Sequence, residues 1–101
     1  MFGTKTKTLT SSGAVTTKVS AGTQTLNAPA RVTSIQAVCS GTAGSIILKD
    51  NGTSGTALVS VATPALATAT VSVDFADMGL RFPTDCFATL ADVTSVTVLY
   101  A

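Results

Sequence analysis

All acidic residues of the chain are aspartates, and carboxylates are its first candidates for chemistry. Asp74, Asp77, Asp85 and Asp92 follow one another in the C-terminal part of the sequence. Paired carboxylates can act as general acid and base, and clusters of them can bind calcium. Residues three apart on a strand point to opposite faces, so a strand does not bring Asp74 and Asp77 together. We therefore expect these aspartates to lie at the surface and in turns.

The segment Asp50-Asn51-Gly52-Thr53 has the composition of the start of a calcium-binding loop. The further acidic ligands and the closing Glu of such a loop are missing. Asn-Gly instead supplies the positive φ values that a tight β-hairpin requires. The segment therefore predicts a hairpin turn and no metal site.

The sequence offers few candidate residues for nucleophilic catalysis. The chain contains no His, so it cannot by itself build a Ser-His-Asp or Cys-His site. Cys39 and Cys86 are far apart in the sequence and do not form a CxxC motif. We expect two buried free thiols, and a single structural disulfide is the alternative. The glycine-rich stretch 41–45 lacks the lysine of a phosphate loop. The sequence thus predicts no enzyme and no cofactor.

The charge balance is equally uninformative about a ligand. Six basic and five acidic residues give a formal net charge of +1, and the basic residues are scattered. A nucleic-acid partner is not expected, because such proteins concentrate positive charge on one face. The sequence contains no apolar stretch of the length that spans a membrane. Its first residues, Met1 to Lys5, lack the apolar core of a secretory signal, so we expect synthesis in a cytoplasm.

The elements that must position these residues are strands. Thr and Val dominate the sequence, and both favour a pleated surface. Alternation with period two predicts strands over residues 4–10, 14–20, 23–26, 31–40, 45–49, 56–63, 68–75, 86–90 and 94–100, with a short strand or bend at 78–83. This pattern predicts one domain over residues 1–101. Its fold class is all-β, an antiparallel β-sandwich or jelly-roll-like barrel of about eight short strands.

The faces of several strands can also be predicted. Alternation places Ile35, Ala37 and Cys39 in the core. It puts Val71, Val73 and Phe75 on one face of their strand, and Val96, Val98 and Tyr100 on one face of the last strand, where the Tyr100 ring is expected in the core. On the strand at 14–20, one face carries Val15, Thr17 and Val19. On the strand at 56–63, one face carries Ala57, Val59 and Val61. Residues 45–49 read as a continuous apolar run, which predicts a central strand buried on both faces.

The N-terminal segment alternates without a clear apolar face. Thr4, Thr6, Thr8 and Thr10 share one face, and Lys5, Lys7 and Leu9 share the other. A strand that buries nothing is weakly held in register, so residues 1–10 are either an arm that pairs with a neighbouring molecule or an ordinary edge strand. The candidate interface residues are Phe2 as an apolar anchor, Lys5 and Lys7 facing acidic groups, and Thr4, Thr6 and Thr8 between them.

Two segments carry a resemblance to a protein family. The first is Gly44-Ser-Ile-Ile-Leu-Lys-Asp-Asn-Gly-Thr-Ser-Gly-Thr56, a strand followed by a turn. The second contains Gly79-Leu-Arg-Phe82 and runs on to the closing Val96-Thr-Val-Leu-Tyr100. Over about residues 31–101 the chain resembles small β-sandwich structural proteins encoded by tailed bacteriophages near their capsid genes. Residues 1–30 lie outside the resemblance.

The resemblance implies a virion structural protein without catalytic residues, assembled in the host cytoplasm. Such proteins serve as head decoration (cement) proteins or as head–tail and tail components, and the resemblance leaves this choice open. The partners it implies are the major capsid protein or another virion protein, and further copies of the chain, with a homotrimer as the expected state. A glycan-binding adhesion module is a third alternative, although the chain has no Trp and one Tyr for stacking on a sugar.

Overall fold

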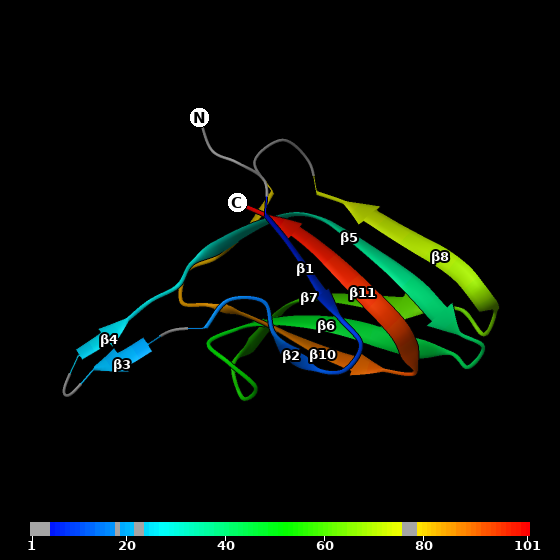
Figure 1. Cartoon of the computed structure of the whole chain (residues 1–101), viewed down its shortest axis with the longest axis horizontal. Coiled ribbons are helices and arrows are strands. Elements are labelled where there is room, and N and C mark those ends of the chain that lie inside the picture. Colours follow the sequence, from blue (N-terminus) through cyan, green and yellow to red (C-terminus); the bar gives the residue numbers. More distant parts are fainter. Residues whose placement is uncertain (1–4, 18, 22–23, 76–78) are drawn as a thin grey trace.

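The computed structural model describes residues 5–17, 19–21, 24–75 and 79–101, and these residues form an all-β protein. Two antiparallel sheets pack face to face as a β-sandwich (Figure 1). The predicted fold class is therefore confirmed. Eleven strands are assigned in the described residues: eight form the two four-strand rows described below, and three are short strands outside these rows.

The first sheet has the strand order β1-β11-β5-β8, and β9 pairs with the first residues of β5. The second sheet has the order β2-β10-β6-β7, and β3 with β4 forms a separate hairpin that extends away from the sandwich in Figure 1. The bounds are β1 Lys5–Leu9, β2 Gly13–Ala14, β3 Val19–Ala21, β4 Gln24–Leu26, β5 Ala30–Ser40, β6 Gly44–Asp50, β7 Thr56–Thr63, β8 Ala67–Asp74, β9 Leu80–Phe82, β10 Cys86–Ala91 and β11 Val93–Tyr100.

The connectivity is that of a jelly roll. With β3, β4 and β9 set aside, eight strands remain, four in each sheet. Successive strands alternate between the sheets, except that β6 and β7 are neighbours in the same one. Two four-stranded sheets with this strand order form a jelly roll, in which each sheet covers the apolar face of the other.

The core lies between the sheets and is built mainly from small side chains. Its largest fully buried side chain is Phe82 on β9, and the others are Ile35, Ile46, Leu48, Val32, Val96, Val98, Cys39 and Cys86. Ala37 is also buried, and Tyr100 packs against the core from the end of β11. The inward faces predicted for β5 and β11 are therefore confirmed.

Two predicted strands differ from the structure. β6 is a central strand as expected, but Ile47 between the buried Ile46 and Leu48 is only half-buried, because one face of a two-layer sandwich meets solvent. The predicted strand 14–20 is interrupted in the structure, since β2 ends at Ala14 and β3 begins at Val19. The β2–β10 ladder stops there because the Thr16 hydroxyl takes the place of a backbone group. This hydroxyl accepts a hydrogen bond from Cys86 N at 2.9 Å and donates one to the Ala28 carbonyl at 2.6 Å.

A bulge explains a third difference. Between β6 and β7 the register shifts after the Leu48–Val59 pair, so that Lys49 pairs with Ala57. Leu58 is the extra residue, and the bulge ends the regular alternation of β7. Val59 and Val61 share a face that packs against the core, whereas Ala57, predicted on the same face, is exposed.

The predicted turn and thiol states agree with the structure. Asn51 and Gly52 both have positive φ, at 73° and 77°, and they begin the loop 51–55 that joins β6 to β7 as a hairpin. Asp92 also has a positive φ of 51° and connects β10 to β11. Cys39 and Cys86 are both free and buried, which excludes the disulfide alternative.

Candidate interaction surfaces

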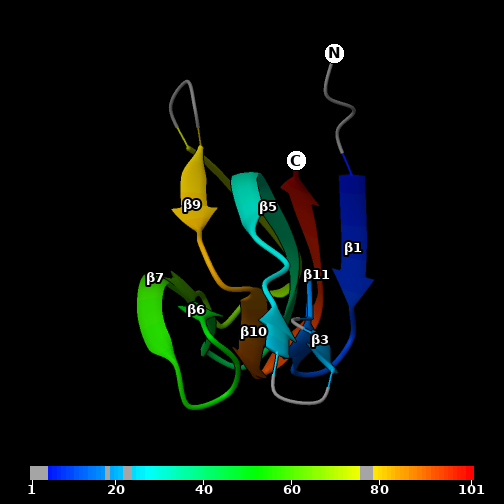
Figure 2. The same cartoon turned by 90° about the vertical axis from the view of Figure 1, so that its left-hand side faces the viewer.

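The sandwich has two sides where its sheets end. On one side the outer strands are β1 and β2, joined by residues 10–12, and on the other they are β7 and β8, joined by residues 64–66. Figure 2 shows β1 and β7 at opposite sides of the molecule. Edge strands present unpaired backbone N–H and C=O groups, so these two sides are where another chain can add a strand.

The β1 side contains the interface residues predicted from the sequence. Lys5–Leu9 pair with β11 of the same chain over five residues, from Lys5 opposite Tyr100 to Leu9 opposite Val96. Residues 5–9 thus occupy the position of an edge strand of the same sandwich, and pairing of this segment with a neighbouring molecule stays a prediction. Lys5, Thr6, Lys7 and Thr8 are all exposed, and Phe2 and Thr4 lie outside the described residues.

The two faces of β1 differ in chemistry. Lys7 stands opposite the fully buried Val98, so Lys5 and Lys7 share the inner face of the sheet with Leu9, which packs against the core. Thr6 and Thr8 are on the outer face, where the Thr8 and Thr97 hydroxyls lie 3.1 Å apart in a cross-strand hydrogen bond. Inward-pointing charges on an edge strand oppose the addition of a further strand. The side chains of β1 therefore protect this edge.

The β7–β8 side was not predicted as a surface. The sequence holds a signal that could have found it, because no charged residue occurs from Asn51 to Val73. Two large apolar side chains in this stretch are exposed, Leu58 at 40% and Leu66 at 60%. Uncharged edges with exposed leucines are typical of surfaces that another protein covers.

Asp50 and Asp85 hold two neighbouring turns together by hydrogen bonds to backbone N–H groups. Asp50 Oδ1 accepts a hydrogen bond from Thr84 N at 2.8 Å, and Asp85 Oδ1 accepts one from Gly52 N at 2.9 Å. Burial, and after it the negative charges of Asp85 and Asp50, together raise the pKa of the neighbouring Cys86 thiol from 9.0 to about 12. Because a thiol with that pKa stays protonated near neutral pH, Cys86 is not an activated nucleophile.

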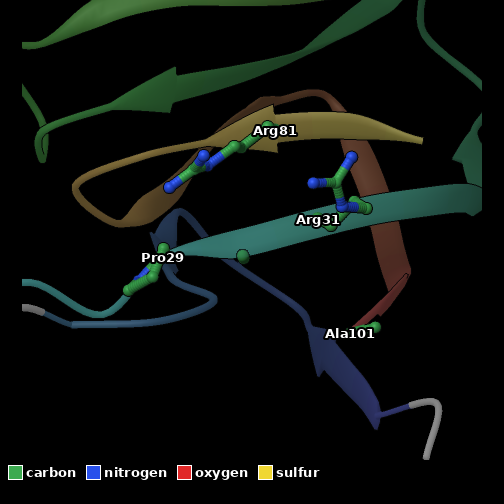
Figure 3. Close-up of a pocket in the computed structure, with 5 residues that line it drawn as sticks. Pro29, Arg31, Arg81 and Ala101 are labelled. Atoms are coloured by element: carbon green, nitrogen blue, oxygen red, sulfur yellow. The ribbon is translucent and has the colours of Figure 1, made fainter. Parts of the chain in front are cut away.

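A shallow depression of about 220 Å³ lies beside β5 and β9 (Figure 3). Arg31 and Arg81 stand opposite each other in the register of these strands, and Pro29, Ala30 and Ala101 complete the lining. The Arg31 and Ala101 backbones exchange two hydrogen bonds of 3.0 and 2.9 Å, which fix the end of β11 here. Guanidinium groups suit an anion, but this lining offers no side-chain nucleophile or general base.

Comparisons with protein-family models, with curated proteins and with solved structures give no significant match to this chain. Within the described residues, no group of three or more His, Cys, Asp or Glu side chains is placed to hold a metal ion. The same part of the chain forms no helix long and apolar enough to cross a membrane.

Proposed function

We propose that this protein is a non-enzymatic virion structural protein, a capsid decoration (cement) protein that binds and stabilises the head lattice of a tailed bacteriophage. The observation that carries the proposal is the resemblance over residues 31–101. The jelly-roll strand order supports it by analogy, because viral capsid domains use this fold, as lectins and cupins also do.

The physical basis of the proposed function is mass action. A protein that binds only the assembled lattice and bridges neighbouring capsid subunits lowers the free energy of the assembled state. A weakly charged surface favours such a role, because little charge has to be desolvated when the protein docks. The proposed oligomer is a homotrimer, which matches the three-fold positions of a capsid lattice.

The experiment is a measurement of copy number and position in purified particles from a strain that carries this gene. Quantitative mass spectrometry gives the ratio of this chain to the major capsid protein, and cryo-electron microscopy locates it. A copy number close to that of the capsid protein, with density on the outer head surface, is the expected result. A much smaller copy number at the neck or tail would identify a head–tail or tail component, and absence from particles would overturn the virion role.

Dissociation of the protein from the same particles tests the stabilising role. Particles stripped of this chain are expected to lose their DNA at a lower temperature than intact particles, and re-addition of purified protein should restore the original temperature. If stripped and intact particles release DNA at the same temperature, the protein does not act as cement.

A further inference from the structure

Asn51 and Gly52 form an Asn-Gly dipeptide at the start of the loop between β6 and β7. In such a dipeptide the backbone nitrogen of the glycine can attack the side-chain amide of the asparagine, because glycine has no side chain to hinder the approach. The chain holds one other asparagine, Asn27, and an alanine follows it. Asn51 is exposed, so water can reach its side chain. The loop therefore presents a site for a spontaneous covalent change.

The reaction uses water as its co-reactant and changes no oxidation state. The Gly52 nitrogen loses its proton and forms a bond to Cγ of Asn51, while the bond from Cγ to the side-chain nitrogen breaks. That nitrogen takes up the proton and leaves as ammonia, and a succinimide ring remains. Water then opens the ring at one of its carbonyl carbons. Opening at Cγ gives an aspartate at position 51, and opening at the backbone carbonyl gives an isoaspartate, whose peptide bond runs through the side chain.

The structure opposes the first step at the Gly52 nitrogen. Its N–H donates a hydrogen bond of 2.9 Å to Oδ1 of Asp85, which is buried. The succinimide nitrogen carries no hydrogen, so the ring cannot form while this bond persists. The deprotonated nitrogen that attacks Cγ also carries negative charge, and the Asp85 carboxylate repels it. Asp85 therefore raises the barrier both through the hydrogen bond that must break and through its charge.

The rest of the loop also holds the reacting residues in place. The Gly52 carbonyl accepts a hydrogen bond from Gly55 N at 3.1 Å. A Cβ at Gly55 would collide with the backbone carbonyl oxygens of Asp50 and Asn51, so the loop closes tightly on the asparagine that reacts. Rotation of the backbone at Asn51 and Gly52 into a ring therefore requires the loop to open.

We propose that Asn51-Gly52 is a site of succinimide and isoaspartate formation, and that the Asp85 carboxylate keeps it unreactive in the folded protein. Local opening of the β6–β7 loop away from Asp85 then sets the rate. Either product places a new negative charge beside Asp50 and Asp85, and the isoaspartate also lengthens the backbone by a methylene group. The original contact is not restored, so the change marks molecules in which this loop has opened. The inference does not depend on a role in a virion.

The first test compares the folded chain with the same full-length chain unfolded in urea, at one temperature and one mildly alkaline pH. Peptide mapping by mass spectrometry locates the replacement of NH2 by OH at position 51, and enzymatic methylation of isoaspartate measures that product. The folded chain is expected to react at least about tenfold more slowly, since a hydrogen bond to a charged group must first be given up. Equal rates in the folded and unfolded chains would overturn the proposal.

The second test separates Asp85 from the general stability of the fold. Asp85→Ala removes the acceptor and its charge, whereas Asp85→Asn keeps an oxygen but removes the charge. The control is Thr63→Val, which removes a buried hydroxyl from the end of β7 that lies away from the loop. Small additions of urea bring the unmodified chain and the control to the same free energy of unfolding as each Asp85 variant.

At this matched stability, Asp85→Ala is expected to react at least about tenfold faster than the unmodified chain and the control, which should react alike. Asp85→Asn should react faster than both but more slowly than Asp85→Ala, and it serves alone if Asp85→Ala does not fold. If all chains of equal stability react at one rate, the reaction proceeds through global unfolding and the proposal is overturned.

Discussion

The backbone N–H of Gly52 donates a hydrogen bond of 2.9 Å to Oδ1 of Asp85, which joins two turns far apart in the sequence. A second bond runs the other way, from Thr84 N to Oδ1 of Asp50 at 2.8 Å. The β6–β7 turn and the β9–β10 connection are therefore held together by two carboxylates. Asp85 is only 5% exposed, so its hydrogen bonds replace water that a surface aspartate would keep.

Removal of the Asp85 carboxylate should destabilise the fold. Asp85→Ala leaves the Gly52 N–H without its charged acceptor, and we expect the free energy of unfolding to fall by about 2 kcal/mol. Urea denaturation followed by circular dichroism measures it. The control is Asp74→Ala, at an exposed position on β8, which should change stability by less than about 0.5 kcal/mol. Equal effects of the two substitutions would contradict a structural role for Asp85.

Ionisation of Cys86 should make the fold less stable in alkali. Burial first, and then Asp85 and Asp50, raise the thiol pKa from 9.0 to about 12 in the folded protein. The unfolded chain therefore loses this proton at a lower pH than the folded chain does. Stability linked to Cys86 is complete below about pH 9 and is lost as the pH rises toward 12, by about 1.4 kcal/mol per pH unit.

Comparison with Cys86→Ala isolates this contribution. Urea unfolding from about pH 8 to about pH 10 should show a steeper loss of stability in the unmodified chain than in the variant, because the variant has no thiol to ionise there. Other titrating groups affect both proteins alike. If the two pH profiles are parallel, the Cys86 pKa is not raised by folding.

Sequence alternation predicted the strands that have one face in the core. Residues 56–63 form β7 with the predicted bounds, and β5 and β11 bury the side chains expected from period two. Alternation works there because a one-residue slip would turn the apolar face to solvent. The strand predicted over 14–20 is interrupted after Ala14 because the hydroxyl of Thr16 takes the place of a backbone partner, and composition does not reveal such a side-chain contact.

Which strands lie at the edges could not be read from alternation. The apolar run at 45–49 predicted the central place of β6, but β5 and β7 both alternate although β5 is central and β7 is an edge, and only the pairing of distant segments decides this. The sequence predicts a candidate interface on the N-terminal segment because neither of its faces is clearly apolar. The structure places Lys5 and Lys7 on the inner face of the β1 edge, and a contact of this segment with another molecule stays a prediction. A separate signal in the sequence is the missing charge between Asn51 and Val73, which includes β7 and most of β8.

Gly44 should be intolerant of a side chain although its backbone is ordinary. A Cβ at this position would collide with the backbone carbonyl oxygens of Ala91 and Asp92 at the β10–β11 turn. Neither oxygen can move without disturbing a sheet, so Gly44→Ala should cost about 3 kcal/mol or more. Gly52→Ala is the control, since Gly52 has open space and a φ of +77°, and should cost only about 1 kcal/mol. Thermal unfolding measures both, and a larger loss for Gly52→Ala would contradict the steric explanation.

Two threonines in the β6, β7 and β10 region should respond in opposite directions to the same substitution. The Thr89 hydroxyl is buried, and within the described residues it has no hydrogen-bond partner. The Thr63 hydroxyl is also buried, but it accepts a hydrogen bond from Gly44 N at 3.1 Å. A buried hydroxyl without a partner costs free energy, whereas a buried N–H that loses its acceptor is left unsatisfied.

Thr89→Val should therefore raise the free energy of unfolding by about 1 kcal/mol, because it replaces the unpaired hydroxyl with a methyl group of similar size on a strand that favours Val. Thr63→Val should lower it by about 1 kcal/mol or more, since the Gly44 N–H then has no acceptor. Urea denaturation of the two variants beside the unmodified chain gives both changes. A loss of stability in Thr89→Val would mean that water or a neighbouring chain satisfies this hydroxyl.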